Sequence, residues 1–233
     1  MKKILLVVLL VGSMVSCRFT SGSGDIVTST RNTGSFTGVS AAGGFEVEIS
    51  IGSFYKVVVE ADDNLIEDVE TTVEGGKLKI RMREHLNVRN AHLKVFITAP
   101  SLTSIQSSAS ADININGKLS EDETIRFNAS SGSSITATVD APGIEADASS
   151  GAEIDLDGRT KNFDAESSSG ASVDAGKLLS ETTKASTSSG ASVEVHASVQ
   201  LDAKASSGGT VKYRGAASVV KKESSGGNIE KVN

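Results

Sequence analysis

The 233-residue sequence predicts an all-β protein, a parallel β-helix with an N-terminal β-rich cap that contains hairpins. The tripeptide Ser-Ser-Gly recurs in the second half of the chain, starting at Ser130, Ser149, Ser168, Ser188, Ser206 and Ser224. Successive copies are 18 to 20 residues apart, and a branched apolar residue stands three positions after each glycine. Between the tripeptides apolar and polar residues alternate, which indicates two short strands per repeat, each with one buried face.

The repeat length favours a β-helix over other repeat folds. Helical repeats need a 3.6-residue period and tolerate few glycines and β-branched residues, and a propeller blade is about twice as long. We therefore assign residues 108–233 to stacked coils of 18 to 22 residues. Glycine supplies the positive φ of each corner. Lys221 and Glu223, at inward positions of the last coil, predict a polar terminal cap.

The first 17 residues are predicted to be a bacterial lipoprotein signal peptide. Two lysines precede eight apolar residues, Ile4 to Val11, and this stretch is far shorter than the ~20 residues of a membrane-spanning helix. The segment Met14-Val-Ser-Cys17 resembles a lipobox, which implies cleavage before Cys17 and its acylation. An ordinary secreted protein with a free Cys17 thiol stays open as the alternative. Residues 18–34, rich in Ser, Thr and Gly, are predicted to be a flexible tether.

Residues 35–107 are predicted to form the N-terminal β-rich part of the domain and to cover the open end of the coils. The segment from Phe45 to Ile51 alternates apolar and polar residues, as a half-buried strand does. Two apolar runs flank Glu74-Gly-Gly-Lys77, which indicates a hairpin. A short helical turn is expected after Asp62-Asp-Asn64.

These segments and the Ser-Ser-Gly units follow an order that resembles the head GIN domain family of auto-transporter adhesins. The motifs that carry the resemblance are Phe36-Thr-Gly-Val39, Gly44-Phe-Glu-Val-Glu-Ile49, Asp62-Asp-Asn-Leu65, Gly76-Lys-Leu-Lys-Ile80 and Ala99-Pro-Ser-Leu102. The resemblance implies a right-handed, single-stranded β-helix and an adhesin-like role in the envelope of a Gram-negative bacterium. It brings no catalytic residues.

Composition and motifs argue against several classes of function. The formal net charge is −6, from 29 acidic and 23 basic residues, so the chain repels nucleic-acid phosphates. No tryptophan and few other aromatic rings are available for stacking on bases or sugars. His85, His92 and His196 have no metal-ligand spacing, and no Gly-x-Ser-x-Gly nucleophile sequence lies in strand and helix context. We expect no cofactor and no nucleic-acid partner.

Outward carboxylates are the candidate site residues, because the coil spacing stacks them in columns. One column contains Asp155, Asp174 and Glu194, and a second group contains Glu145, Asp164, Asp147 and Glu166. The first interpretation is a solvated face whose charges are screened by salt. A second is a weak Ca²⁺ site with oxygen ligands from adjacent coils. A third is catalysis by paired carboxylates, which needs a cleft that these uniform coils do not predict.

The sequence therefore predicts a non-catalytic, lipid-anchored outer-membrane protein that binds through a rigid β-helical surface. Its expected partners are the membrane, through acylated Cys17, and a glycan or an extracellular or envelope protein, through the outward faces of residues 125–205. One alternative is a degenerate polysaccharide lyase or hydrolase that uses Asp155 and Asp174. Another is a structural scaffold of the envelope. The sequence does not assign the periplasmic or the outer face of the membrane.

Overall fold

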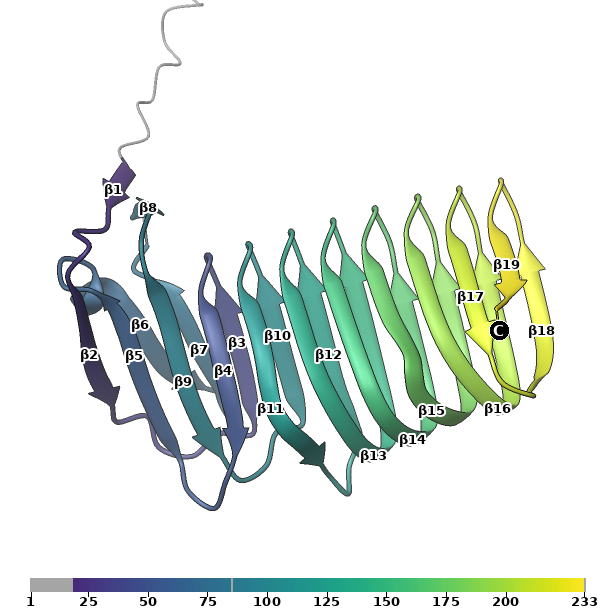
Figure 1. Cartoon of the computed structure of the whole chain (residues 1–233), viewed down its shortest axis with the longest axis horizontal. Helices are drawn as coiled ribbons and strands as arrows, with labels where there is room; N and C mark the ends of the chain where they lie inside the picture. Colours follow the sequence, from purple (N-terminus) through teal and green to yellow (C-terminus); the bar gives the residue numbers. More distant parts are fainter. Residues whose placement is uncertain (1–18, 85, 233) are drawn as a thin grey trace, which may run out of the picture.

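The computed structural model describes residues 19–84 and 86–232, and this part of the chain is nearly all β. Its strands stack along one axis into a β-solenoid (Figure 1). The 3-10 helix η2 (Ile66–Asp68) interrupts the β structure near the N-terminal end. Within the described residues, no helix is long and apolar enough to cross a membrane.

Each coil has two arms, joined by a tight turn at one edge and a wide bend at the other (Figure 1). We call these the turn edge and the bend edge. Four long strands run through the bend and contain both arms: β13 (Ser134–Ser149), β14 (Glu153–Ser167), β15 (Ser172–Thr187) and β16 (Ser192–Ala205). The prediction of two separate short strands per repeat is thus wrong for these coils, because the bend keeps its strand pairing.

The arms form two sheets that face each other across the core. The first sheet contains β4 (Glu46–Ile51), β11 (Asp112–Ser120), the first halves of β13 to β16, β17 (Thr210–Arg214) and β19 (Asn228–Lys231). The second sheet contains β3 (Gly38–Ala42), β10 (Ser104–Ser108), β12 (Ile125–Ser130), the second halves of β13 to β16, and β18 (Ser218–Glu223). Neighbouring strands in these two stacks are parallel.

Like residues lie above each other, as the repeat predicts. In the first sheet the buried column is Ile113, Ile135, Ile154, Val173, Val193, Val211 and Ile229. In the second sheet the corresponding column is Ile125, Ile144, Phe163, Thr183, Leu201 and Val219. The Thr183 hydroxyl is buried there and contacts the Ser180 hydroxyl, which satisfies a polar group in an otherwise apolar column.

The tight turns use two left-handed residues, one more than the sequence predicts. Ser150 and Gly151 have φ of 54° and 71°, and the Ala152 N–H donates to the Ser149 carbonyl at 3.2 Å. Two positive φ angles with this hydrogen bond define a type I′ turn. Gly151 N–H in turn donates to the carbonyl of Ser169 in the next coil at 3.2 Å, so the backbone ladder continues around the turn edge.

The N-terminal strands extend both sheets and cover the first coil. β7 (Lys77–Met82) adds to β3 and β9 (Leu93–Ala99) adds to β4, both in parallel. β6 (Val69–Glu74) pairs antiparallel with β7 as the predicted hairpin, and β5 (Lys56–Asp62) pairs antiparallel with β9. The turn expected after Asp62 is η2, although Asp62 does not cap it with its side chain.

The prediction of a flexible tether over residues 18–34 is corrected by the structure, because this segment contains two paired strands. β1 (Phe19–Ser21) pairs with β8 (Asn87–Arg89), and β2 (Ile26–Arg31) pairs antiparallel with β5 along its whole length. The buried carboxylate of Asp62 accepts the backbone N–H groups of Gly24 and His92, both at 2.7 Å, and these hydrogen bonds lower its pKa. The β-branched residues of β2 and this carboxylate hold a segment whose Ser and Gly content predicted flexibility. The predicted signal peptide and Cys17 lie outside the described residues.

Polar side chains close the C-terminal end, as predicted. Lys221 Nζ donates to the carbonyl of Ile229 at 2.9 Å, and Glu223 Oε1 accepts the N–H of Ile229 at 2.6 Å. These bonds link the two arms of the last coil and place charged groups where another strand would otherwise pair.

Candidate binding surface

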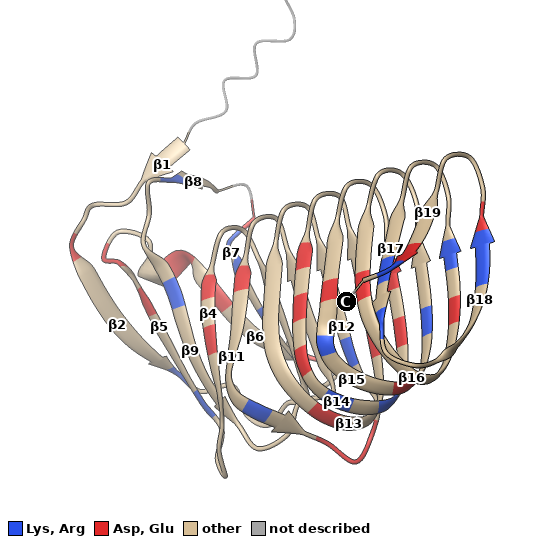
Figure 2. Cartoon of the chain, turned by 45° about the vertical axis from the view of Figure 1, so that its right-hand side comes forward, with Lys and Arg blue, Asp and Glu red and all other residues tan. Residues whose placement is uncertain are grey.

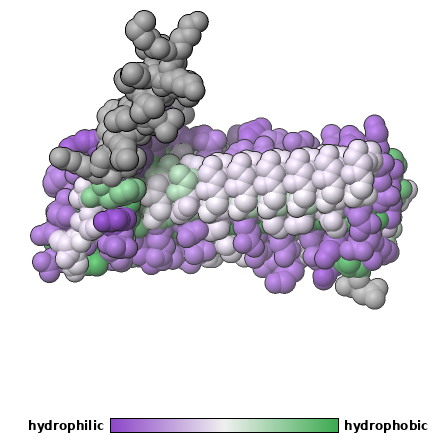
Figure 3. Space-filling model, turned by 90° about the horizontal axis from the view of Figure 1, so that it is seen from above, coloured by the Kyte–Doolittle hydropathy of each residue, from purple (hydrophilic) through white to green (hydrophobic). Residues whose placement is uncertain are grey.

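Charged side chains cover the two outer faces of the rod and leave the tight turns free of charge (Figure 2). This distribution follows from strand geometry, because side chains alternate between the core and the solvent along each arm. The turn edge itself is a stripe of serine and glycine that runs along the rod (Figure 3). The outer faces are therefore where the predicted site residues lie.

The first predicted column exists in the expected register. Thr136, Asp155, Asp174 and Glu194 are successive partners across β13, β14, β15 and β16. Burial and the neighbouring carboxylate of Asp174 raise the pKa of Asp155. Glu194 Oε1 lies 2.7 Å from Arg214 Nη2, so a basic side chain of the next coil compensates the negative charge of the last carboxylate in the column.

The second predicted group lies on the opposite face, in the second sheet. Glu145 pairs with Asp164, and Asp147 pairs with Glu166, in adjacent coils. Arg126 Nε lies 2.8 Å from Glu145 Oε2. The seven acidic residues are therefore divided between the two outer faces of the rod, because the bend turns the second half of each coil onto the other sheet.

Residues 19–84 and 86–232 contain no group of three or more His, Cys, Asp or Glu side chains that could hold a metal ion. His92 Nε2 lies 2.7 Å from Glu60 Oε1, which is an isolated pair. His85 is outside the described residues. The Ca²⁺ site expected from the stacked carboxylates stays a prediction.

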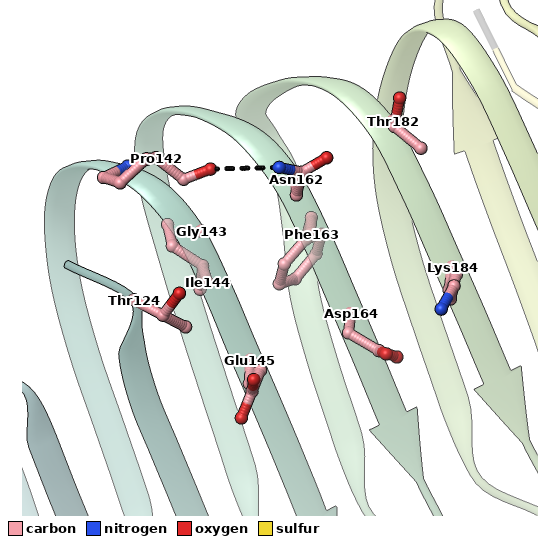
Figure 4. A pocket seen from close by; sticks show the side chains of 10 residues that line it. All are labelled: Thr124, Pro142, Gly143, Ile144, Glu145, Asn162, Phe163, Asp164, Thr182 and Lys184. Atoms are coloured by element: carbon pink, nitrogen blue, oxygen red, sulfur yellow. Dashed lines mark hydrogen bonds between the residues drawn. The ribbon is translucent and has the colours of Figure 1, made fainter.

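A hollow of about 370 Å³ lies over the second sheet near the bend edge (Figure 4). Thr124 packs directly over Gly143 in this hollow, where a Cβ atom would come within 2.6 Å of Thr124 Oγ1. Glu145, Asp164 and Lys184 stand in successive coils along one side of it, and Asn162 Nδ2 donates to the Pro142 carbonyl at 3.5 Å (Figure 4). The other lining residues are Ile144, Phe163 and Thr182.

Two further hollows continue this one toward the turn edge. The second, of about 230 Å³, shares Glu145 and Asp164 with the first. The third, of about 270 Å³, shares Asn128 and Asp147 with the second and reaches the tight turns at Ser149. Together they make a shallow trough along the second sheet, which we call the trough. Its carboxylates, amides and hydroxyls offer hydrogen bonds to an extended ligand. No sequence signal marks the trough, because most of its lining residues are ordinary outward positions of adjacent coils.

A wider hollow, of about 560 Å³, lies on the bend edge beside an irregular coil. β15 has extra residues between Ala175 and Leu179 relative to β16, and Leu179 is 56% exposed beside the hollow. The nearly constant spacing of the Ser-Ser-Gly units did not predict this bulge, because the bend absorbs one or two extra residues without a change in the tight turns.

Comparison with known proteins places this architecture in a family. Residues 35–217 match the family model described as "Putative auto-transporter adhesin, head GIN domain". The chain belongs to the head GIN domain family. No curated protein matches it.

Several solved bacterial protein structures share the fold. A putative adhesin from Bacteroides fragilis has a TM-score of 0.82 and 18% identity, over 91% of this chain and 100% of that one. A putative lipid binding protein from Parabacteroides distasonis has a TM-score of 0.75 and 18% identity, over 93% and 100% of the two chains. A putative adhesin from Parabacteroides merdae has a TM-score of 0.71 and 16% identity, over 92% and 99%. At these identities the likeness concerns the fold.

Proposed function

We propose that this head GIN domain protein is a lipid-anchored, non-catalytic protein of the bacterial outer membrane that binds its partner through the outer faces of the rod. The observation that carries the proposal is the trough, an open strip of polar side chains on a rigid sheet. Membership of an adhesin-like family favours the same interpretation. An open strip suits contact with a long partner better than it suits turnover of a small one.

The geometry gives less support to the enzyme alternative. Asp155 and Asp174 are stacked in adjacent coils on an open face, without an inserted loop beside them. Glycoside hydrolysis needs two carboxyl groups that flank the scissile bond in a site that orients the sugar. The raised pKa of Asp155 is explained by its burial and by Asp174. Polysaccharide cleavage that the D155A/D174A variant abolishes would overturn this part of the proposal.

The position of Phe19 supports an anchor at the turn edge. β1 and β8 stand beyond the tight turns at the N-terminal end (Figure 1), and Cys17 precedes Phe19 by two residues. A lipid on Cys17 would bring the membrane to the uncharged turn edge. The charged faces then keep their contact with water, which avoids the cost of burying charge.

The chemistry of the trough indicates its ligand class. Carboxylates, amides and hydroxyls are spaced along an extended path, which fits a hydroxyl-rich chain such as a glycan. The trough has four carboxylates, Glu145, Asp147, Asp164 and Glu166, against the basic residues Arg126 and Lys184. This excess of negative charge favours a neutral or basic ligand over a sulfated or uronic-acid glycan.

Binding of the purified chain to a panel of glycans and of matrix and envelope proteins tests the proposal. The trough variant E145Q/D164N should weaken the partner's binding by about tenfold or more, since hydrogen bonds to charged groups contribute ~1.5–3 kcal/mol each. The variant D155N/D174N, on the opposite face, is the matched control and should bind like wild type. No binding above background, or equal loss in both variants, would contradict the trough as the site.

The anchor has its own test. Cells that express the chain and are fed an alkyne-bearing fatty acid should label it, and the C17S variant should lose the label. Protease treatment of intact cells then assigns the side of the membrane. An unlabelled wild-type chain would contradict the anchor and leave the trough experiment unaffected.

A further inference from the structure

β2 is an open sheet edge at the N-terminal end of the rod (Figure 1). It pairs with β5 on one side, and among the described residues no strand pairs with its other side. The other terminal strands, β6, β18 and β19, carry charged residues such as Glu74, Lys222 and Glu230, which discourage further pairing. β2 reads Ile-Val-Thr-Ser-Thr-Arg, without proline or bulge, and Ile26 is 48% exposed. Such an edge is a template for another strand.

The free backbone groups of β2 can be assigned from its pairing with β5. Asp63 N–H donates to the Asp25 carbonyl at 2.8 Å, and bonded and non-bonded pairs alternate along an antiparallel ladder. The odd-numbered residues of β2 therefore bond to β5. Ile26, Thr28 and Thr30 direct their N–H and C=O groups away from the molecule.

Charge selects the direction in which a second β2 strand would pair. The start of β2 is acidic, with exposed Asp25 and Asp63, and its end is basic, with Arg31 and exposed Lys56. Antiparallel pairing of two copies brings each acidic end to the basic end of the other, whereas parallel pairing would align like charges. With a twofold axis at Thr28, Asp25 of one copy lies opposite Arg31 of the other.

Arg31 also has an unused donor. Its Nη2 atom donates to the Ile66 carbonyl at 2.6 Å, while its Nε is buried without a hydrogen-bond partner among the described residues. An unsatisfied buried donor costs free energy. The side chains of Asp25 and Arg31 project on the same face of β2, because residues of equal parity share a face. Asp25 of a second copy would therefore place a carboxylate on the same face as the Arg31 guanidinium, an opposite-charge pair across the two strands.

We propose that two copies of this chain pair through β2, antiparallel about a twofold axis at Thr28. The pairing continues the first sheet from one rod into the other. It turns the second rod end for end, so the turn edges of the two rods point in opposite directions. If Cys17 is anchored as proposed above, copies in one membrane cannot pair in this way, and copies in two apposed membranes can. The pair is then a homophilic contact between membranes, and this part alone rests on the proposed anchor.

Cross-linking of the full chain in detergent tests the strand pairing. Directly opposed residues in a hydrogen-bonded antiparallel pair have Cα atoms ~5.5 Å apart, within the range of a disulfide. T28C should form a disulfide-linked dimer under mild oxidation, about tenfold or more above N228C, the control at the opposite end of the rod. The wild-type chain gives the background from Cys17. Equal cross-linking of T28C and N228C would overturn the proposal.

Two further variants separate pairing from folding. Thr28 N–H does not bond to β5, so T28P should keep the circular dichroism spectrum and melting temperature of wild type while it removes the pairing. D25K should weaken pairing because it places two basic side chains opposite each other. Light scattering should show dimers for wild type and monomers for T28P at the same concentration. Dimers that persist in T28P would overturn the proposal.

Vesicles that carry the acylated chain test the contact between membranes. Wild type should cluster vesicles, and T28P should not. Clustering that fails while T28C still cross-links would contradict the membrane contact and the anchor geometry, and would leave strand pairing standing. Clustering by T28P equal to wild type would show another contact and overturn the β2 assignment.

Discussion

Ser169 occupies a left-handed backbone conformation in one of the tight turns, with φ of 54°. Its side chain is exposed and makes no hydrogen bond with the described residues, so replacing it tests the backbone alone. Valine is strained in this region, and S169V should lower the free energy of unfolding by roughly 1–2 kcal/mol. Asparagine tolerates positive φ and is preferred before glycine in type I′ turns. S169N should therefore raise the free energy of unfolding, by a smaller amount than S169V lowers it.

Thermal unfolding followed by circular dichroism measures the effect. For a chain of this size ~1 kcal/mol corresponds to ~2–4 °C, so S169V should melt ~2–8 °C below wild type. The matched control is S186V, the same substitution at an outward position of strand β15, where a β-branched residue fits. S186V should stay within about 2 °C of wild type. Equal losses in S169V and S186V would refute the assignment of strain to the turn.

Three more changes probe the coils. A Cβ at Gly158, where φ is 115°, would lie 2.0 Å from the Val139 carbonyl oxygen, whereas Gly170 has open space, so G158A should destabilise far more than G170A in urea unfolding. The pKa of Asp155 is raised in the folded protein, so ionisation of this carboxyl opposes folding. D155N should therefore raise the melting temperature at pH 7, and it should have no such effect below pH 4, where the carboxyl is protonated in both states. Arg159 and Lys118 lower the pKa of Asp140 to about 2, so its stabilisation is fully present above pH 4 and is lost as the pH falls through 2. D140N should therefore lower the melting temperature above pH 4, and the difference from wild type should shrink as the pH falls below 4.

Each of these has an outcome that contradicts it. Similar unfolding midpoints for G158A and G170A would show that the coils part enough to accept a Cβ beside the Val139 carbonyl. A melting temperature of D155N equal to wild type at all pH values would show that water screens Asp155 fully. A loss in D140N that persists well below pH 2 would indicate packing rather than charge, since Asp140 is then protonated in the folded chain as well.

The sequence alone could predict the coils because their signal repeats. The branched apolar residue after each Ser-Ser-Gly defines an inward column, and six copies fix the register that the strands show. The hairpin at Gly75-Gly76 could also be predicted from the sequence, because two successive glycines between apolar runs suit a turn with two positive φ angles.

Other features depended on contacts that no local pattern contains. Residues 18–34 as a whole have the composition of a linker, and strand β2 forms within them because β5 offers a free edge and Asp62 accepts hydrogen bonds from distant residues. The acidic residues could be assigned to columns but not to faces, since the bend decides which column turns to which side. The trough depends on how the side chains of adjacent coils pack beside one another, and no local sequence pattern contains this information.

The hydrophobic core is covered at the two ends of the rod by residues that the middle coils do not use. At one end these are the N-terminal strands, and at the other Lys221 and Glu223 bridge the arms. A gene duplication or deletion that adds or removes one whole coil would therefore leave both terminal closures intact and change the length of the protein by ~4.8 Å. Members of the family can in this way differ in the length of the rod while they keep the same terminal structures.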